Sequence, residues 1–228
     1  MKSRSLTLRR LSDRLVKVIA SASAMIGLVA LAWILCVILA NGAGAINWEF
    51  FTRLPAPPGV PGGGLANAIL GTVLMTAVAT LVGVPIGLMA GIFLAEFGKA
   101  SKVAPAVRFA ANVLMGTPSI LIGVFVYTLI VVPVGRFSGY AGALALAVII
   151  LPVVTRTTED MLHLVPDSLR EAALALGAPR WKVTLGIVFR AAKSGLLTGI
   201  LLAVARVSGE SAPLLFTALN SPYSVRSL

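Results

Sequence analysis

Five long apolar runs decide what this chain can fold into, because about 20 apolar residues in a helix are enough to cross the hydrocarbon core of a membrane. Apolar residues make up 58% of the 228 residues and charged residues only 12%. A typical soluble domain carries about 25% charged residues. The runs are 18–40, 65–97, 108–134, 139–154 and 195–216. The sequence therefore predicts an all-α fold, a polytopic membrane helix bundle with five spans.

The basic residues lie in clusters between these runs. Residues 1–17, 98–108 and 155–193 hold fifteen of the nineteen Lys and Arg residues, whereas 41–64 and 135–138 hold one each. Loops on the cytoplasmic side of a membrane are enriched in Lys and Arg. This pattern explains the net charge of +11 without a nucleic-acid partner. It predicts a multi-pass membrane protein, surrounded by lipid, with a cytoplasmic N-terminus.

The chain is expected to divide into four parts along its length. A basic cytoplasmic tail, 1–17, precedes a first span whose apolar run is too long for a typical signal peptide. That uncleaved span and a Pro/Gly-rich extracytoplasmic loop make up 18–64, the remaining spans make up the transmembrane domain 65–222, and 223–228 is a short tail. Five spans place the C-terminus outside. A last span is therefore expected to be missing, either through truncation or because the protein naturally lacks it.

A polar, cationic segment at 167–192 separates the fourth and fifth apolar runs. Asp167 and Ser168 are of the residue types that cap helix N-termini, and Gly177 suits a helix C-terminus, where the backbone often adopts a positive φ. The segment therefore predicts a short amphipathic helix at about 168–178, followed by a sharp turn. An ordinary helix lying in the membrane interface explains the same pattern.

This segment resembles the EAA loop of bacterial ABC-importer permeases. The residues that match the family's motif are Glu171, Ala172, Ala173, Gly177 and Ile187. The motif usually ends in Leu-Pro, and this chain has Phe189-Arg190 in that place. Three further stretches, 112–127, 156–162 and 205–219, are similar to the phosphate-transport (PstA-type) branch of the family.

The resemblance implies an ABC-importer permease fold and a function in phosphate import. The chain would be an inner-membrane permease subunit that forms part of the pathway for the phosphate anion. Its coupling helix, with Glu171, Ala172, Ala173 and Gly177, would dock into a cleft of a separate ATP-binding subunit. A second, PstC-like permease subunit would complete the pore, and an extracytoplasmic phosphate-binding protein would deliver the substrate. The family also has a closing helix, which is missing here.

Two charged residues stand inside the fifth apolar run. Arg206 and Glu210 are four residues apart, which places them on one face of a helix, and Arg206 follows Lys193 by about 20 Å of helix. A charge at that depth is costly unless it faces a cavity or a partner. Because a guanidinium donates two parallel hydrogen bonds to phosphate, we expect Arg206 to bind the anion, with Glu210 holding it and Ser208 adding a hydroxyl. The alternative is a structural pair that pins two helices.

Three other features have two interpretations each. Arg156, near the inner end of the fourth run, either contacts the anion or anchors the helix at the membrane face, with Glu159 and Asp160 as solvated neighbours. Residues 116–119, Gly-Thr-Pro-Ser, predict either a helix break that lines a cavity or a simple proline kink. The glycines 83, 87 and 91 are typical of close helix packing.

Several chemistries are not expected in this chain. It contains no phosphate-binding G-x-x-x-x-G-K-[ST] loop, so ATP would be hydrolysed by another chain and this chain would not be an enzyme. A single histidine, His163, and a single cysteine, Cys36, predict no metal site and no cofactor. Two alternative functions remain. One is an ABC permease for another small oxyanion or solute, and the other is a truncated membrane scaffold that does not transport.

Overall fold

The computed structural model describes residues 6–57, 60 and 62–219 and divides the chain into two compact units, Met1–Gly64 and Leu65–Leu228. The described residues form helices and turns, with no strand among them. Four of these helices are long and apolar enough to cross a membrane, or five spans if one sharply bent helix pair counts as a span. The predicted all-α membrane bundle is confirmed.

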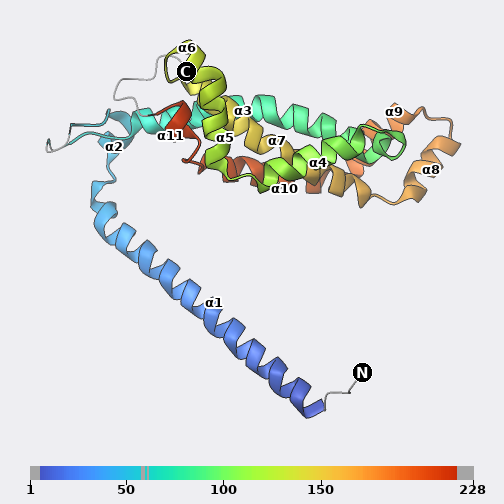
Figure 1. Cartoon of the computed structure of the whole chain (residues 1–228), viewed down its shortest axis with the longest axis horizontal. Coiled ribbons are helices and arrows are strands. Elements are labelled where there is room, and N and C mark those ends of the chain that lie inside the picture. The colour runs from blue at the N-terminus through green and yellow to red at the C-terminus, as the bar shows by residue number, and fades with distance from the viewer. Residues whose placement is uncertain (1–5, 58–59, 61, 220–228) are drawn as a thin grey trace. The chain divides into compact units, whose positions relative to one another are not determined.

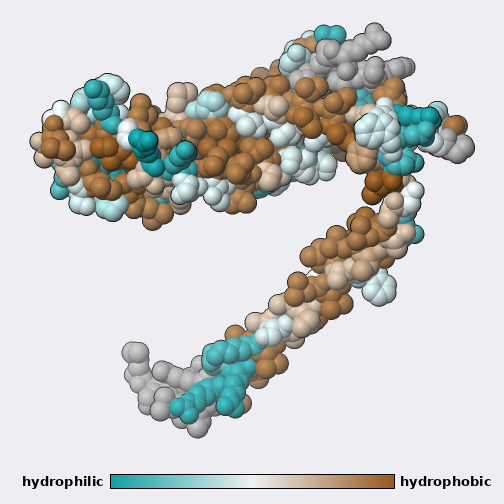
Figure 2. All heavy atoms as spheres, turned by 180° about the vertical axis from the view of Figure 1, so that it is seen from behind, coloured by the Kyte–Doolittle hydropathy of each residue, from teal (hydrophilic) through white to brown (hydrophobic). Residues whose placement is uncertain are grey.

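The first unit contains one long helix. The helix α1 covers Leu6–Gly42, the 3₁₀ turn η1 covers Ala43–Ala45, and the short helix α2 covers Trp48–Thr52. The side chain of Asn47 caps α2 by accepting a hydrogen bond of 2.8 Å from the N–H of Phe50. Figure 2 shows α1 as mostly hydrophobic, with hydrophilic residues gathered toward the end where the chain begins. This helix therefore extends the apolar run at both ends.

The second unit is a bundle in which α3, α4, α7 and α10 run lengthwise (Figure 1). The helices α8 and α9 lie at one end of the bundle, and α5, α6 and α11 lie at the other. The elements are α3 (Ala66–Ile92), η2 (Phe93–Phe97), η3 (Gly98–Ala100), α4 (Ala104–Gly116), α5 (Ser119–Val126), η4 (Tyr127–Val131), α6 (Val132–Val134), α7 (Gly139–His163), α8 (Asp167–Ala175), α9 (Arg180–Val183), η5 (Thr184–Val188), α10 (Phe189–Ser208) and α11 (Leu214–Thr217). The segments η2, η4 and η5 are single π-helical turns within longer helices.

The helices α3 and α7 approach each other along a row of glycines on α3. A Cβ on Gly83 would lie 3.1 Å from the carbonyl oxygen of Ala147, and one on Gly87 would lie 2.8 Å from the Cβ of Val154. Gly91 faces Thr158 at still shorter range. A Cβ on Gly87 or Gly91 would be closer to α7 than real Cβ atoms come to other atoms, and one on Gly83 would require its neighbours to shift, so glycine permits this separation of the two helices. The close packing expected from the glycine spacing is confirmed.

The core lies mainly on α7. Side chains from its middle, including Leu146, Ile150 and Val154, are almost fully buried against α3, α5 and α10. A second apolar cluster at the α8 end joins Leu162 to Val188. The central position of α7 makes it the element against which the other spans are placed.

Two span limits differ from those expected from the apolar runs. The fourth span does not end at Val154, because α7 continues to His163. The fifth is one helical stretch, Arg180–Ser208, and does not extend to residue 216. Apolar runs mark the residues that tolerate lipid, whereas a helix can continue beyond them with polar side chains. The 116–119 stretch is a true break, since the helices on its two sides meet at 105°.

Candidate functional site

The charged residues of the predicted fifth span do not form the pair that their spacing suggested. The helix α10 ends at Ser208, so Glu210 lies beyond it and shares no helix face with Arg206. No ion pair joins the two side chains in the described part of the chain. The expectation that Glu210 holds Arg206 is therefore wrong. Arg206 lies in the last turn of α10, where the negative end of the helix dipole stabilises a cation.

Glu210 instead connects the segment after α10 to the break in the third span. Its Oε1 accepts a hydrogen bond of 2.7 Å from the Oγ of Ser119, the first residue of α5. A carboxylate at a helix N-terminus is stabilised by the unsatisfied N–H groups there. The same segment packs tightly on α5, since a Cβ on Gly123 would lie 2.6 Å from the Cα of Pro213. These contacts fix the segment that follows Arg206.

Arg206 and Ser208 remain together at this end of α10. Arg206 is exposed, and its guanidinium makes no hydrogen bond or ion pair with any described residue. Ser208 is also exposed, and its hydroxyl donates to the Ala205 carbonyl oxygen at 2.8 Å within the same helix. The guanidinium of Arg206 is thus free to donate to a ligand, while the nearby carboxylate of Glu210 is engaged with Ser119.

Arg156 belongs to a separate ionic cluster around Glu159. The Glu159 side chain is only 3% exposed, and each of its oxygens has its own guanidinium. The Nε of Arg108 lies 2.6 Å from Oε1, and the Nη1 of Arg156 lies 2.7 Å from Oε2. Arg108 also donates to the Leu94 carbonyl oxygen at 3.2 Å. One buried carboxylate therefore joins α4, α7 and the end of the second span.

This cluster was only partly visible in the sequence. The expectation that Glu159 is solvated is wrong, because α7 continues past the apolar run and carries Glu159 into the bundle. Asp160, by contrast, is exposed as expected. The spacing of three residues between Arg156 and Glu159 was the available signal. Nothing in the sequence pointed to Arg108 as the second partner.

The polar segment forms α8 where a short helix was predicted, but its start differs. Pro166 occupies the N-cap position, and no side chain caps the helix. Asp167 and Ser168 are therefore not the caps that were expected. Asp167 stands in the first turn, where its negative charge is favourable.

The end of α8 follows the predicted geometry. Gly177 has a φ of +80°, the left-handed conformation that favours glycine. The N–H of Gly177 donates to the Leu174 carbonyl oxygen at 2.9 Å, and that of Ala178 donates to the Ala173 carbonyl oxygen at 3.2 Å. This double hydrogen bond is the Schellman arrangement, which terminates helices. Of the four residues expected to contact an ATPase, three are exposed to solvent and one is buried. The exposed residues are Glu171, Ala172 and Gly177, and the buried one is Ala173.

Arg170 is the residue of this segment that the sequence analysis missed. Its Nη2 lies 2.9 Å from the Oε1 of Glu96 at the end of the second span. Its Nη1 donates to the Val165 carbonyl oxygen at 2.6 Å, and its Nη2 donates to that of Leu162 at 2.8 Å. A lone acid at the inner end of an apolar run, Glu96, was the signal that could have indicated a basic partner.

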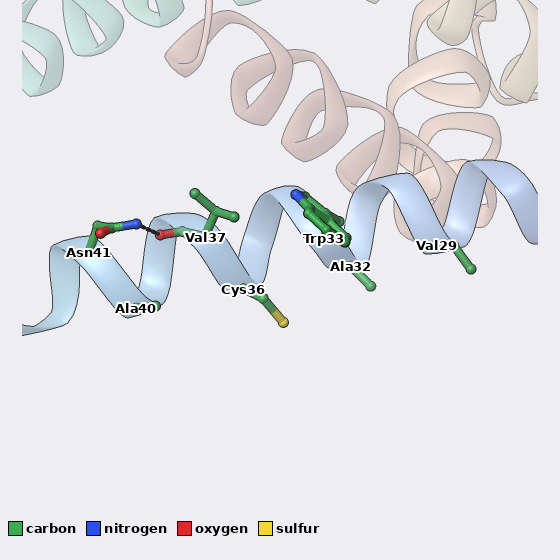
Figure 3. A pocket seen from close by; sticks show the side chains of 7 residues that line it. All are labelled: Val29, Ala32, Trp33, Cys36, Val37, Ala40 and Asn41. Atoms are coloured by element: carbon green, nitrogen blue, oxygen red, sulfur yellow. Dashed lines mark hydrogen bonds between the residues drawn. The ribbon is translucent and has the colours of Figure 1, made fainter.

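The first unit has a depression of a different, mostly apolar kind. A shallow depression on α1 is lined by Val29, Ala32, Trp33, Cys36, Val37, Ala40 and Asn41, all from this one helix (Figure 3). The only hydrogen bond drawn there joins the Asn41 amide to the Val37 carbonyl oxygen, at 2.8 Å. Within the described ranges, no group of three or more His, Cys, Asp or Glu side chains could hold a metal ion.

Comparison with known proteins decides the family. Residues 83–227 match the family described as the inner membrane component of binding-protein-dependent transport systems. The chain belongs to this family. It is 49% identical over 215 residues to the phosphate transport system permease protein PstA of Yersinia pestis, covering 94% of this chain and 73% of that relative. It is 40% identical to PstA 1 of Mycobacterium tuberculosis (strain H37Rv), covering 93% of this chain and 70% of that relative.

A solved structure has the same fold. The chain superimposes on a protein chain of the inward-facing MetNI methionine ABC transporter with a TM-score of 0.61 and 25% sequence identity, over 68% of this chain and 74% of that one. The ABC-importer permease fold expected from the sequence is therefore confirmed. The protein is a multi-pass permease of the inner membrane, and its family implies a substrate-binding protein and an ATPase as partners.

Proposed function

We propose that this chain is the permease subunit of an ATP-driven importer of inorganic phosphate. The observation that carries the proposal is its similarity to phosphate permeases from several genera, which are 47–49% identical to it over at least 94% of its length. The free guanidinium at the end of α10 supplies the chemistry that such a function needs. A planar guanidinium donates two parallel hydrogen bonds to a phosphate group.

Arg206 and Ser208 form the outer part of the proposed pathway. Arg206 carries a positive charge that no described carboxylate neutralises, so an oxyanion gains its full attraction there. Glu210 serves this site indirectly, because its bond to Ser119 fixes the segment next to Arg206. Arg156 forms the inner part, where a departing anion would compete with Glu159 for the guanidinium.

The energy for transport would enter through α8. With the N-terminus in the cytoplasm, α8 lies on the cytoplasmic side and docks into a separate ATP-binding subunit through Glu171, Ala172, Ala173 and Gly177. ATP-driven movement of that subunit would carry α8 with it and change the side to which the pathway opens. A PstC-like second permease subunit would complete the pore, and an extracytoplasmic phosphate-binding protein would deliver the anion.

A transport assay tests this function. The chain is assembled with the partner subunits encoded in its own genome, and uptake of labelled phosphate is measured with and without excess sulfate. We expect ATP-dependent uptake that sulfate does not suppress and that Arg206→Gln abolishes while the protein stays in the membrane. Uptake suppressed by sulfate would indicate another oxyanion as the substrate, and unchanged uptake in the Arg206→Gln variant would refute the assigned role of Arg206.

A further inference from the structure

The side chain of Arg170 ties α8 to two other helices at once. Two of its nitrogens, Nε and Nη2, contact the Oε1 of Glu96 at 3.3 and 2.9 Å. Two further contacts go to main-chain carbonyl oxygens at and just after the end of α7, Nη1 to Val165 at 2.6 Å and Nη2 to Leu162 at 2.8 Å, and a third joins Nη1 to the Oδ1 of Asp167 within α8 at 3.2 Å. A single guanidinium therefore joins α8, the π-helical end of the second span and the loop after α7.

This contact is shielded from solvent. The side chain of Arg170 is 17% exposed and that of Glu96 is 12% exposed. Ion pairs on a protein surface are weakened by water and salt, but a pair with so little exposure is screened much less. The planar fork of arginine also fixes the direction of each hydrogen bond. The link is thus both strong and directional.

Apolar packing alone holds α8 weakly. Ala173 is buried against the inner apolar cluster, but it contributes only one methyl group. Leu169, Leu174 and Leu176 are exposed, and Leu176 is 89% exposed. The position of α8 relative to the bundle therefore depends mainly on Arg170 and on the turns that join α8 to its neighbours in the chain.

We propose that Arg170 is the positioning residue through which α8 moves the inner end of α3. This proposal rests on the proposed function of α8 as the coupling helix. The chain connects α8 directly to α7 and α9 but not to α3, which lies far away in the sequence. The ion pair between Arg170 and Glu96 connects α8 directly to the second span.

The receiving segment is suited to such a movement. Glu96 lies in η2, a π-helical turn between Phe93 and Phe97. Such turns are less regular than the α-helix and often occur at functional sites. The rest of α3 is packed closely against α7 along the glycine row. A displacement of η2 would therefore move α3 as a whole, because α3 has little room to shift relative to α7. Movement of α8 would then shift α3 and α7 together.

The test measures phosphate transported per ATP hydrolysed by the fully assembled importer in proteoliposomes. The variants are Glu96→Gln, Arg170→Gln, their combination and Arg170→Lys. Glu96→Gln is the decisive one, because it keeps the size of the side chain and leaves the carbonyl contacts of Arg170 intact. Asp167→Asn is the matched control: its carboxylate also lies 3.2 Å from Arg170, but it is 75% exposed and belongs to α8 itself.

We expect Glu96→Gln and Arg170→Gln each to lower the ratio about tenfold, with ATP hydrolysis and subunit assembly retained. The double variant should be no worse than Arg170→Gln, Arg170→Lys should be intermediate, and Asp167→Asn should match the wild type. An unchanged ratio in Glu96→Gln would overturn the proposal. So would a parallel loss of transport and hydrolysis, since that indicates a purely structural role.

The proposed function can fail separately from this inference. If the wild-type importer carries another anion and not phosphate, the proposed substrate is wrong, and the same ratio is then measured with the anion that it does carry. A reduced ratio in Glu96→Gln would still support the role of Arg170, and a wild-type ratio would still refute it.

Discussion

Three arginines at the α8 end of the bundle have carboxylate partners of a kind that Arg206, at the opposite end of α10, lacks. At the α8 end, Arg108, Arg156 and Arg170 all bind carboxylates that are nearly buried. At the opposite end of α10, Arg206 has no described partner, although Glu210 is only four residues away. All four residues are arginines, so they differ in whether a carboxylate pairs with them and not in residue type.

This difference separates two roles for a charge in a membrane protein. A buried carboxylate between two guanidiniums fixes helices relative to one another, although its single negative charge balances only one of the two positive charges. An unpartnered guanidinium costs more to place near the membrane and therefore needs a functional reason. Arg108 and Arg170 are accordingly expected to affect stability and coupling, Arg156 to affect stability and the inner part of the pathway, and Arg206 to affect substrate binding.

Glu159→Gln should give the largest change in stability. It removes the one negative charge that Arg108 and Arg156 share, and leaving such groups unpaired in a buried site costs about 3–5 kcal/mol. Because both guanidiniums are about one-third exposed, water will offset part of this cost, and we expect a loss of about 2 kcal/mol. Thermal unfolding of the purified protein in detergent measures it.

The matched control for that change is Asp160→Asn. Asp160 follows Glu159 in α7 and also approaches Arg156, at 4.0 Å, but its side chain is 59% exposed. Its loss should change the unfolding temperature very little. Equal effects of the two substitutions would mean that burial does not distinguish the paired charges, and the comparison between the two ends would lose its basis.

The sequence predicted the elements of this structure better than their contacts. Apolar runs located the spans, the Gly-Thr-Pro-Ser stretch located the break, and Gly177 located the end of α8, because each of these signals is local. The helix limits were less predictable, since α7 and the Arg180–Ser208 helix both extend into polar sequence.

The site depends on long-range partners that no local pattern records. Arg108 and Glu159 are 51 residues apart, Glu96 and Arg170 are 74 apart, and Ser119 and Glu210 are 91 apart. The spacing of four residues between Arg206 and Glu210 suggested a pair only on the assumption that the helix continued. Once α10 ends at Ser208, Glu210 is free to reach the N-terminus of α5 instead.

Ser119→Ala should have a smaller effect than Glu159→Gln but should act at the end that carries Arg206. It removes the described hydrogen-bond donor of Glu210, and a hydrogen bond to a charged group contributes about 1.5–3 kcal/mol. Because Glu210 is only partly buried, we expect a loss near the lower end of that range, about 1.5 kcal/mol, together with slower phosphate uptake.

Thr128→Val provides the comparison for Ser119→Ala. Its hydroxyl also makes one hydrogen bond, of 2.6 Å, but to the Val124 carbonyl oxygen within the same helical stretch. Its loss should leave uptake unchanged, because no second segment depends on it. If Ser119→Ala likewise leaves uptake unchanged, then the Ser119–Glu210 contact does not position the segment beside Arg206.

Thr76→Val should have the smallest effect on stability and uptake. It tests whether a polar group without a hydrogen-bond partner necessarily belongs to the substrate pathway. The Thr76 hydroxyl oxygen is buried on α3 and has no hydrogen-bond partner among the described residues. Valine has nearly the same shape, so removing a buried, unsatisfied hydroxyl should leave stability unchanged or raise it by up to about 1 kcal/mol. Thr155→Val is the contrast, because Thr155 is also buried and its hydroxyl donates to the Leu151 carbonyl oxygen at 2.8 Å. Unfolding temperature and phosphate uptake are measured for both. A loss of uptake in Thr76→Val alone would mean that this hydroxyl meets the substrate or a water molecule on its route, so the pathway between Arg206 and Arg156 would include α3.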